Sequence, residues 1–189
     1  MKERPILFSA PMVRALLAGT KTQTRRIVKA RDLEWMDVHQ GLREPDNAER
    51  CPYGQPGDRL WVRETFRGCR AYEVQGYPPK DWGNKPIWFE ADGAPPGRPD
   101  QWASRSRPSI HMPRWASRIT LEITSVRVER LRACNEVDAI AEGAPWAACG
   151  APQEGSHKAG FAQLWEQING HGSWEANPWV WVIEFRRLP

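Results

Sequence analysis

The stretch Gly19-Thr20-Lys21-Thr22-Gln23-Thr24-Arg25-Arg26 joins a predicted helix to a predicted strand, and it places a lysine among hydroxyl and guanidinium groups. Before it, apolar residues recur at helical spacing over residues 10–18, and Gly19 ends that helix. After it, the threonines favour a strand whose side chains alternate between two faces. Lys21 lies on the joint, so its side chain meets Thr24 only if the chain bends there. The conformational freedom of Gly19 permits such a bend.

Four segments of the chain, in order, resemble the ASCH family, the RNA-associated relatives of the PUA domains. The quoted stretch resembles the family's Gly-x-Lys-Thr-x-Thr-x-Arg signature. The other three are a strand that begins with Gly-Asp at residues 57–62, a short Ala-x-x-Glu helix at 139–143 and a closing strand at 179–185. The resemblance is to a long member of the bacterial or bacteriophage type. It implies a single ASCH domain over residues 1–189 with an α+β fold, a PUA-like, partly open β-barrel of five to seven strands with peripheral helices.

The resemblance covers about residues 5–66 and 110–187 and leaves about 67–109 as a large insertion. This insertion is rich in proline and glycine and carries Trp82, Trp88 and Trp102. Exposed tryptophans are unfavourable in water, so we expect the segment to be an ordered loop. Its tryptophans either form a lid that stacks on a base or cover apolar surface of the scaffold.

Outside the insertion, hydrophobic periodicity predicts further helices at 136–142 and 158–169, the second with a core-facing stripe of Phe161, Leu164, Trp165 and Ile168. A one-residue change in the apolar phase near Thr124 and Ser125 indicates a β-bulge. The helices are expected on the outside of the barrel or across its mouth.

The resemblance implies that Lys21, Thr24 and Glu142 match the catalytic trio of those ASCH proteins that look like amidohydrolases of N4-acylated cytidine. A threonine hydroxyl needs a neighbouring base, and lysine serves only when it is neutral. Burial and nearby cations favour the neutral amine, whereas an ionised Glu142 opposes it. Glu142 either serves the leaving amine or donates a proton to the substrate. Alternatively, Lys21 stays charged and stabilises an oxyanion while Glu142 activates water.

Five further residues are candidates for substrate binding, by charge or by stacking. Glu64 falls on an otherwise apolar strand face, where a buried carboxylate needs a partner such as Arg26 or Lys21. An imidazole, a guanidinium and an indole precede a later strand and suit phosphate contact and base stacking. The predicted substrate-binding set is Arg26, Glu64, His111, Arg114 and Trp115.

The competing interpretation is an RNA- or nucleotide-binding module, with or without the ribonuclease activity that some ASCH proteins resemble. In it, Lys21, Arg25, Arg26 and Arg114 contact phosphate and a tryptophan stacks on a base. A formal charge of +4 and a pI near 9.0 permit a nucleic acid partner without requiring one.

Composition bounds the remaining possibilities. No apolar run approaches the roughly 18 residues of a membrane span and no signal peptide is evident, so we expect a cytoplasmic protein without membrane contact. The four cysteines and four histidines lack the spacing of metal ligands, and we expect neither a metal nor another cofactor. No obligate protein partner is inferred; the expected partner is a modified nucleoside or RNA.

Overall fold

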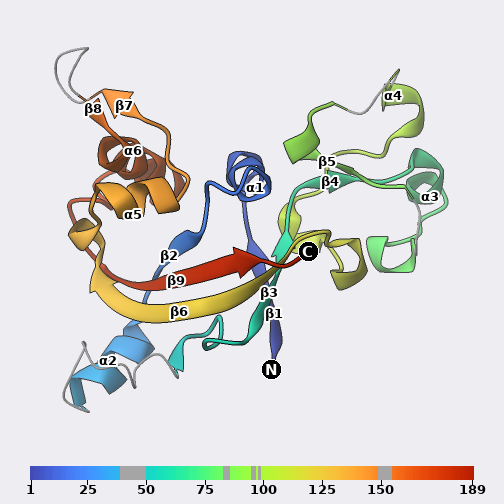
Figure 1. The fold of residues 1–189 in the computed structure, drawn as a ribbon. Coiled ribbons are helices and arrows are strands. Elements are labelled where there is room, and N and C mark those ends of the chain that lie inside the picture. The colour runs from blue at the N-terminus through green and yellow to red at the C-terminus, as the bar shows by residue number, and fades with distance from the viewer. Residues whose placement is uncertain (39–49, 83–85, 95–96, 98, 149–154) are drawn as a thin grey trace.

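The centre of the fold is a five-stranded, mostly antiparallel sheet (Figure 1). The computed structural model describes residues 1–38, 50–82, 86–94, 97, 99–148 and 155–189. Across the sheet, the strands run in the order β1 (Glu3–Leu7), β3 (Arg59–Arg63), β6 (Thr120–Arg130), β9 (Trp179–Arg187) and β2 (Gln23–Ile27). Strands β1 and β3 pair in parallel, and the other neighbours pair in antiparallel fashion.

The sheet is curved but not closed. The register of β6 against β9 shifts between Ile123 and Ser125, which confirms the predicted bulge and accompanies the bend of β6. Among the described strands, β1 and β2 remain the two edges of the sheet, so the barrel is open. The α+β class expected from the sequence is confirmed.

Helices pack on the sheet close to the predicted positions. Helix α1 (Ala10–Leu17) precedes β2, while α5 (Glu136–Ala141) and α6 (His157–Asn169) lie together on one side of the sheet (Figure 1). Asn135 caps α5 through a reciprocal pair of hydrogen bonds with Asp138, as the sequence predicts for a helix start. Helix α2 (Ala30–Val38) follows β2, and the short strands β7 (Ala147–Ala148) and β8 (Gly155–Ser156) form a small ribbon.

Strand β9 separates two hydrophobic cores, which explains its strict alternation. Trp181, Ile183 and Phe185 belong to the larger core, with residues of β1, β3, β6 and α1. Val180 and Val182 face the other way, into a core made with α5 and α6. Burial on both faces makes β9 a fixed platform for its neighbour β2, which carries Thr24.

The insertion forms a separate body on the opposite side of the molecule from α5 and α6, with α1 between them in the view of Figure 1. It contains or borders β4 (Phe66–Arg67), α3 (Arg70–Val74), β5 (Trp88–Phe89), α4 (Pro99–Trp102) and short 3-10 segments at Pro79–Asp81, Glu90–Asp92, Ser109–His111 and Arg114–Ala116. Trp82 is 1% exposed in a third core, and Trp88 stacks beside Trp102 with ring centroids 4.2 Å apart. Among the described residues, these tryptophans pack within the insertion and its borders.

Candidate active site

The turn after α1 carries Lys21 to the end of α5. Gly19 adopts a φ of +76°, and the chain leaves the helix directly before Lys21. The Thr22 amide donates a 2.8 Å hydrogen bond to the Ala141 carbonyl, and Lys21 and Glu142 form an isolated antiparallel bridge. Gly143 permits this approach, because a Cβ there would lie 2.9 Å from the Ala15 Cβ and 3.1 Å from the Lys21 Cβ. The bend expected at this joint therefore serves to bring Lys21 to Glu142.

The Lys21 ammonium is enclosed and fully hydrogen-bonded. Its side chain is 0% exposed, and Nζ donates to the Gln23 carbonyl at 2.8 Å, the Glu142 carbonyl at 2.7 Å and Glu142 Oε2 at 2.9 Å. Burial lowers the pKa of Lys21 from its usual value, and the nearby charges of Arg26 and Arg25 add to this, while Glu142 opposes it. The three acceptors match the three protons of a charged ammonium, so the contacts hold the charged form against the effect of burial.

The Glu142 carboxylate is shared between two cations. Oε2 accepts from Lys21, and Oε1 accepts from Arg25 Nη1 at 3.2 Å. Arg25 is itself 0% exposed and also pairs with Asp138 at 3.2 Å and Glu129 at 3.4 Å. Arg25 thus joins the start of α5, through Asp138, to its end at Glu142.

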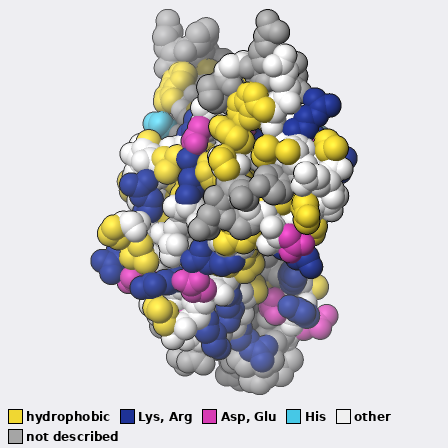
Figure 2. Space-filling view, turned by 90° about the vertical axis from the view of Figure 1, so that its right-hand side faces the viewer, with side chains coloured by type: hydrophobic (Ala, Val, Ile, Leu, Met, Phe, Trp, Pro, Cys, Tyr) yellow, Lys and Arg dark blue, Asp and Glu magenta, His cyan; other side chains and the backbone are white. Residues whose placement is uncertain are grey.

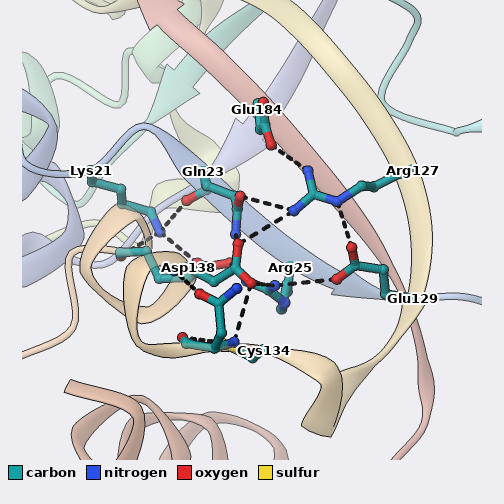
Figure 3. Close-up of polar contacts among 10 residues, drawn as sticks. Lys21, Gln23, Arg25, Arg127, Glu129, Cys134, Asp138 and Glu184 are labelled. Atoms are coloured by element: carbon teal, nitrogen blue, oxygen red, sulfur yellow. Dashed lines mark hydrogen bonds and ion pairs between the residues drawn. The ribbon is translucent and has the colours of Figure 1, made fainter. Parts of the chain in front are cut away.

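A second layer of charge surrounds Arg25 (Figure 3). The Arg127 guanidinium contacts Glu129, Glu184, Asp138 and Gln23, so it links β6, β9, α5 and β2. Although burial raises the pKa of Asp138, the Asn135 amide and the Arg25 charge outweigh it and hold that pKa below its usual value. The network fixes α5, and with it Glu142, against the edge of the sheet.

Thr24 and Glu142 line the same cavity, which has a volume of about 240 Å³. Thr24 is 2% exposed. Its hydroxyl lies at the cavity and forms no hydrogen bond with another described residue. Arg25 and Arg26 form part of the wall, with Met12 and Tyr53. Helix α6 supplies the rest through Phe161, Leu164, Trp165, Ile168 and Asn169. Lys21 does not line the cavity and reaches it only through Glu142.

Arg26 lines the cavity, and its guanidinium makes one hydrogen bond to the described residues. Its Nη2 donates to the Leu7 carbonyl at 2.8 Å, and the group lies 5.3 Å from the centroid of the Phe8 ring. Burial lowers the pKa of Arg26, while Tyr53 and Glu142 oppose that change. Of the five predicted substrate-binding residues, Arg26 is the one that the described structure places at the cavity.

The predicted partner of Glu64 is wrong. Glu64 is 1% exposed, but Arg118 binds it with two hydrogen bonds of 2.9 and 3.0 Å, instead of Arg26 or Lys21. Arg118 also pairs with Asp92, and its guanidinium lies 4.0 Å from the centroid of the Phe89 ring. Arg118 thereby connects Asp92 of the insertion to Glu64, directly after β3, so the Glu64 carboxylate has a structural partner.

His111, Arg114 and Trp115 lie away from the cavity. Arg114 pairs with Glu3 at 3.1 Å on strand β1, the opposite edge of the sheet from β2. His111 lines a separate hollow at the insertion, and Trp115 is 36% exposed. These three residues are not part of the cavity wall that contains Thr24.

Helix α6 contributes more to the cavity than its sequence pattern indicated. Phe161 and Trp165 are buried as predicted, whereas Ile168 is 54% exposed and Leu164 is partly exposed at the cavity. A helical apolar stripe does not distinguish a core contact from a cavity wall. Tyr53, in a turn-rich segment, carried no local signal for a role at the cavity.

Metal and membrane features give two separate findings. In the described part of the chain, no group of three or more His, Cys, Asp and Glu side chains is arranged to hold a metal ion. No helix among these residues is long and apolar enough to cross a membrane.

Comparison with solved structures gives an ASCH domain from Lactobacillus crispatus JV V101, with a TM-score of 0.38 and 13% sequence identity over 98% of this chain and 79% of that chain. No family model matches this chain, and no curated protein matches it. Since this likeness is distant, it does not by itself indicate a function. In sequence pattern, the chain resembles the ASCH family.

Proposed function

We propose that the protein hydrolyses a small acyl amide on a modified cytosine nucleoside, with N4-acetylcytidine as the test substrate. The observation that carries the proposal is that Thr24 and Glu142 line one cavity, while Lys21, outside the cavity wall, binds the Glu142 carboxylate. An apolar wall with a few convergent polar groups suits a flat base. The ASCH resemblance supplies the acyl-cytidine class, and the cavity supplies a hydroxyl and a carboxylate for its chemistry.

In the proposed reaction, the Thr24 hydroxyl attacks the acyl carbon and Glu142 takes its proton. The carbon–nitrogen bond then breaks, Glu142 gives the proton to the departing amino group of cytidine, and the acyl group remains as an ester on Thr24. Water, deprotonated by Glu142, releases the carboxylic acid and restores Thr24. Lys21 acts through Glu142 as a positioning residue, because its side chain is enclosed and its three protons are already bound.

The test is turnover by the purified protein. Incubated with N4-acetylcytidine and without added metal, wild-type protein should release cytidine and acetate in equal amounts, as measured by chromatography. The proposed function would be contradicted if protein that still melts cooperatively released no cytidine at any pH near neutrality. Both this function and the binding function below place the protein in the cytoplasm, among nucleosides and RNA.

Lys21→Met should lower kcat/KM for N4-acetylcytidine but leave measurable turnover, because Lys21 acts by holding the Glu142 carboxylate in place. A lysine that is itself the base predicts loss of activity at every pH. The measurement is kcat/KM for N4-acetylcytidine against pH in wild-type and Lys21→Met protein.

Trp165→Phe should raise KM for N4-acetylcytidine about 5-fold with little change in kcat, the effect of losing one neutral hydrogen bond. Trp165 lines the cavity, and its indole Nε1 is buried without a hydrogen-bond partner among the described residues. A base offers carbonyl and ring-nitrogen acceptors for such a donor. The matched control is Trp181→Phe, since Trp181 Nε1 is equally buried and unpartnered in the described structure but lies outside this wall. Equal changes in KM for both variants would contradict a contact from Trp165.

The second candidate is an RNA- or nucleotide-binding module, with or without ribonuclease activity. The observation that favours it is that Arg25 and Arg26 line the cavity and bring cationic groups to it. A binding module predicts no turnover of N4-acetylcytidine and an RNA affinity that falls steeply with salt and drops in Arg26→Ala. The same protein preparation can be tested for both behaviours.

A further inference from the structure

The insertion and the segment that follows it build a basic hollow, distinct from the Thr24 cavity. Its volume is about 400 Å³, and it is lined by Lys80, Arg105, Arg107 and His111 with Pro78, Pro79 and Pro113. These residues come from three short segments that are brought together by the packing around Trp82. Figure 2 looks onto the side of the molecule where α3 and α4 lie in Figure 1, and Lys and Arg side chains gather in several groups on it.

The charge of the hollow is only partly neutralised. Glu73 serves both Arg105 at 2.9 Å and Arg107 at 3.2 Å, so one carboxylate balances two guanidinium groups. Lys80 is exposed and has no ion-pair partner among the described residues. The three cations Lys80, Arg105 and Arg107, set against the single carboxylate of Glu73, leave an excess of positive charge at the hollow.

One of the four basic groups is held rigidly. The Arg107 side chain is 17% exposed, and its guanidinium lies 5.2 Å from the centroid of the buried Trp82 ring. Its Nε is buried and unpartnered among the described residues. Lys80 and Arg105, by contrast, extend into solvent, and the Arg105 side chain is 77% exposed. The hollow therefore combines one largely buried guanidinium with solvent-exposed cations at its rim.

We propose that this basic hollow binds the phosphate groups of a single nucleic-acid strand. Three of the lining residues are prolines, which have no backbone N–H to donate. The cationic side chains of Lys80, Arg105 and Arg107 are therefore the main hydrogen-bond donors of the hollow. Cations from two segments, Lys80 in one and Arg105 and Arg107 in the other, suit successive phosphates better than one small anion. Such contacts hold the sugar–phosphate backbone without reading sequence. The insertion would thus add an anchoring site on a different face from the cavity.

The experiment measures binding of a short, fluorescently labelled single-stranded RNA by anisotropy over a series of salt concentrations. Lys80→Gln/Arg105→Gln should weaken binding about 10-fold at low salt and reduce the slope of log K against log salt by about 1.4, which corresponds to two lost phosphate contacts. A DNA strand of the same sequence should behave alike, because the proposed contacts are to phosphate. The double variant should keep its melting temperature and its turnover of free N4-acetylcytidine, so this test is separate from that of the cavity.

The matched control is Lys29→Gln/Arg132→Gln, which removes the same charges elsewhere. Arg132 pairs with Glu175 at 3.0 Å, much as Arg105 pairs with Glu73. This control should keep the wild-type salt slope. An equal loss in both double variants, or an unchanged slope in Lys80→Gln/Arg105→Gln, would overturn the proposal. Displacement of the RNA by equimolar inorganic phosphate at constant ionic strength would also overturn it, in favour of a small-anion site.

Discussion

Thr24→Val should lower kcat for N4-acetylcytidine by at least about 10³-fold, because it removes the hydroxyl that receives the acyl group. Valine has nearly the shape of threonine, and the Thr24 hydroxyl makes no hydrogen bond to another described residue, so the fold should tolerate the change. KM should change little if the hydroxyl acts mainly in the transition state. The measurement is steady-state kinetics, with a melting curve for each preparation.

Two matched variants sharpen this test. Thr24→Ser keeps a hydroxyl and should retain measurable turnover, whereas Thr22→Val changes an exposed threonine two residues away and should behave as wild type. Full hydrolysis by Thr24→Val would show that no ester forms on Thr24 and that Glu142 activates water directly. If RNA binding were the only function, Thr24→Val would leave a salt-dependent affinity unchanged.

Glu142→Leu should lower the free energy of unfolding by about 3–5 kcal/mol, the usual cost of leaving one partner of a buried ion pair alone. Lys21 and Glu142 are 0% and 3% exposed, so solvent cannot replace the lost carboxylate. Lys21→Met should be destabilising for the same reason. The double variant Lys21→Met/Glu142→Leu should recover part of the loss, because the buried Lys21 charge is removed together with its partner and Arg25 keeps Asp138 and Glu129. Chemical denaturation of the four proteins measures this cycle.

The control for this cycle is Glu175→Leu, at an exposed ion pair. Its carboxylate is 71% exposed beside Arg132, and its loss should cost at most about 1 kcal/mol. Additive losses in the Lys21 and Glu142 variants would contradict a coupled buried pair. Because Glu142→Leu affects stability, the loss of activity in that variant must be measured well below its melting temperature.

The sequence predicted the elements whose burial is one-sided or strictly alternating. Helices α1, α5 and α6 start and end within about a residue of their expected limits. A buried helical apolar stripe marks α1 and α6, whereas the Asn135 cap marks α5, whose Val137 and Ile140 are exposed. Strand β9 alternates because it divides two cores. Strand β1 was missed: only Ile6 of Glu3–Leu7 is buried, and a proline interrupts it, so no period-two pattern appears.

The sequence located the signature residues but not their partners. Lys21 and Glu142 are 121 residues apart, and Glu64 and Arg118 are 54 apart, so the folded chain decides which acid meets which base. The ASCH resemblance singles out Glu142 as a site residue. No sequence pattern indicates a partner for Glu64, and the predicted partner was wrong. Arg25 appeared in the sequence only as a nearby cation, but it is a second partner of Glu142.

The most direct test of the account asks where the acyl group goes. With protein in excess over N4-acetylcytidine, samples quenched in acid at early times should contain protein that carries one acetyl group, located by peptide mass spectrometry on Thr24. The acetyl group should appear as cytidine is released and disappear as acetate forms. Cytidine release with no acetyl group on the protein at any time, together with full activity in Thr24→Val, would contradict Thr24 as the acyl acceptor.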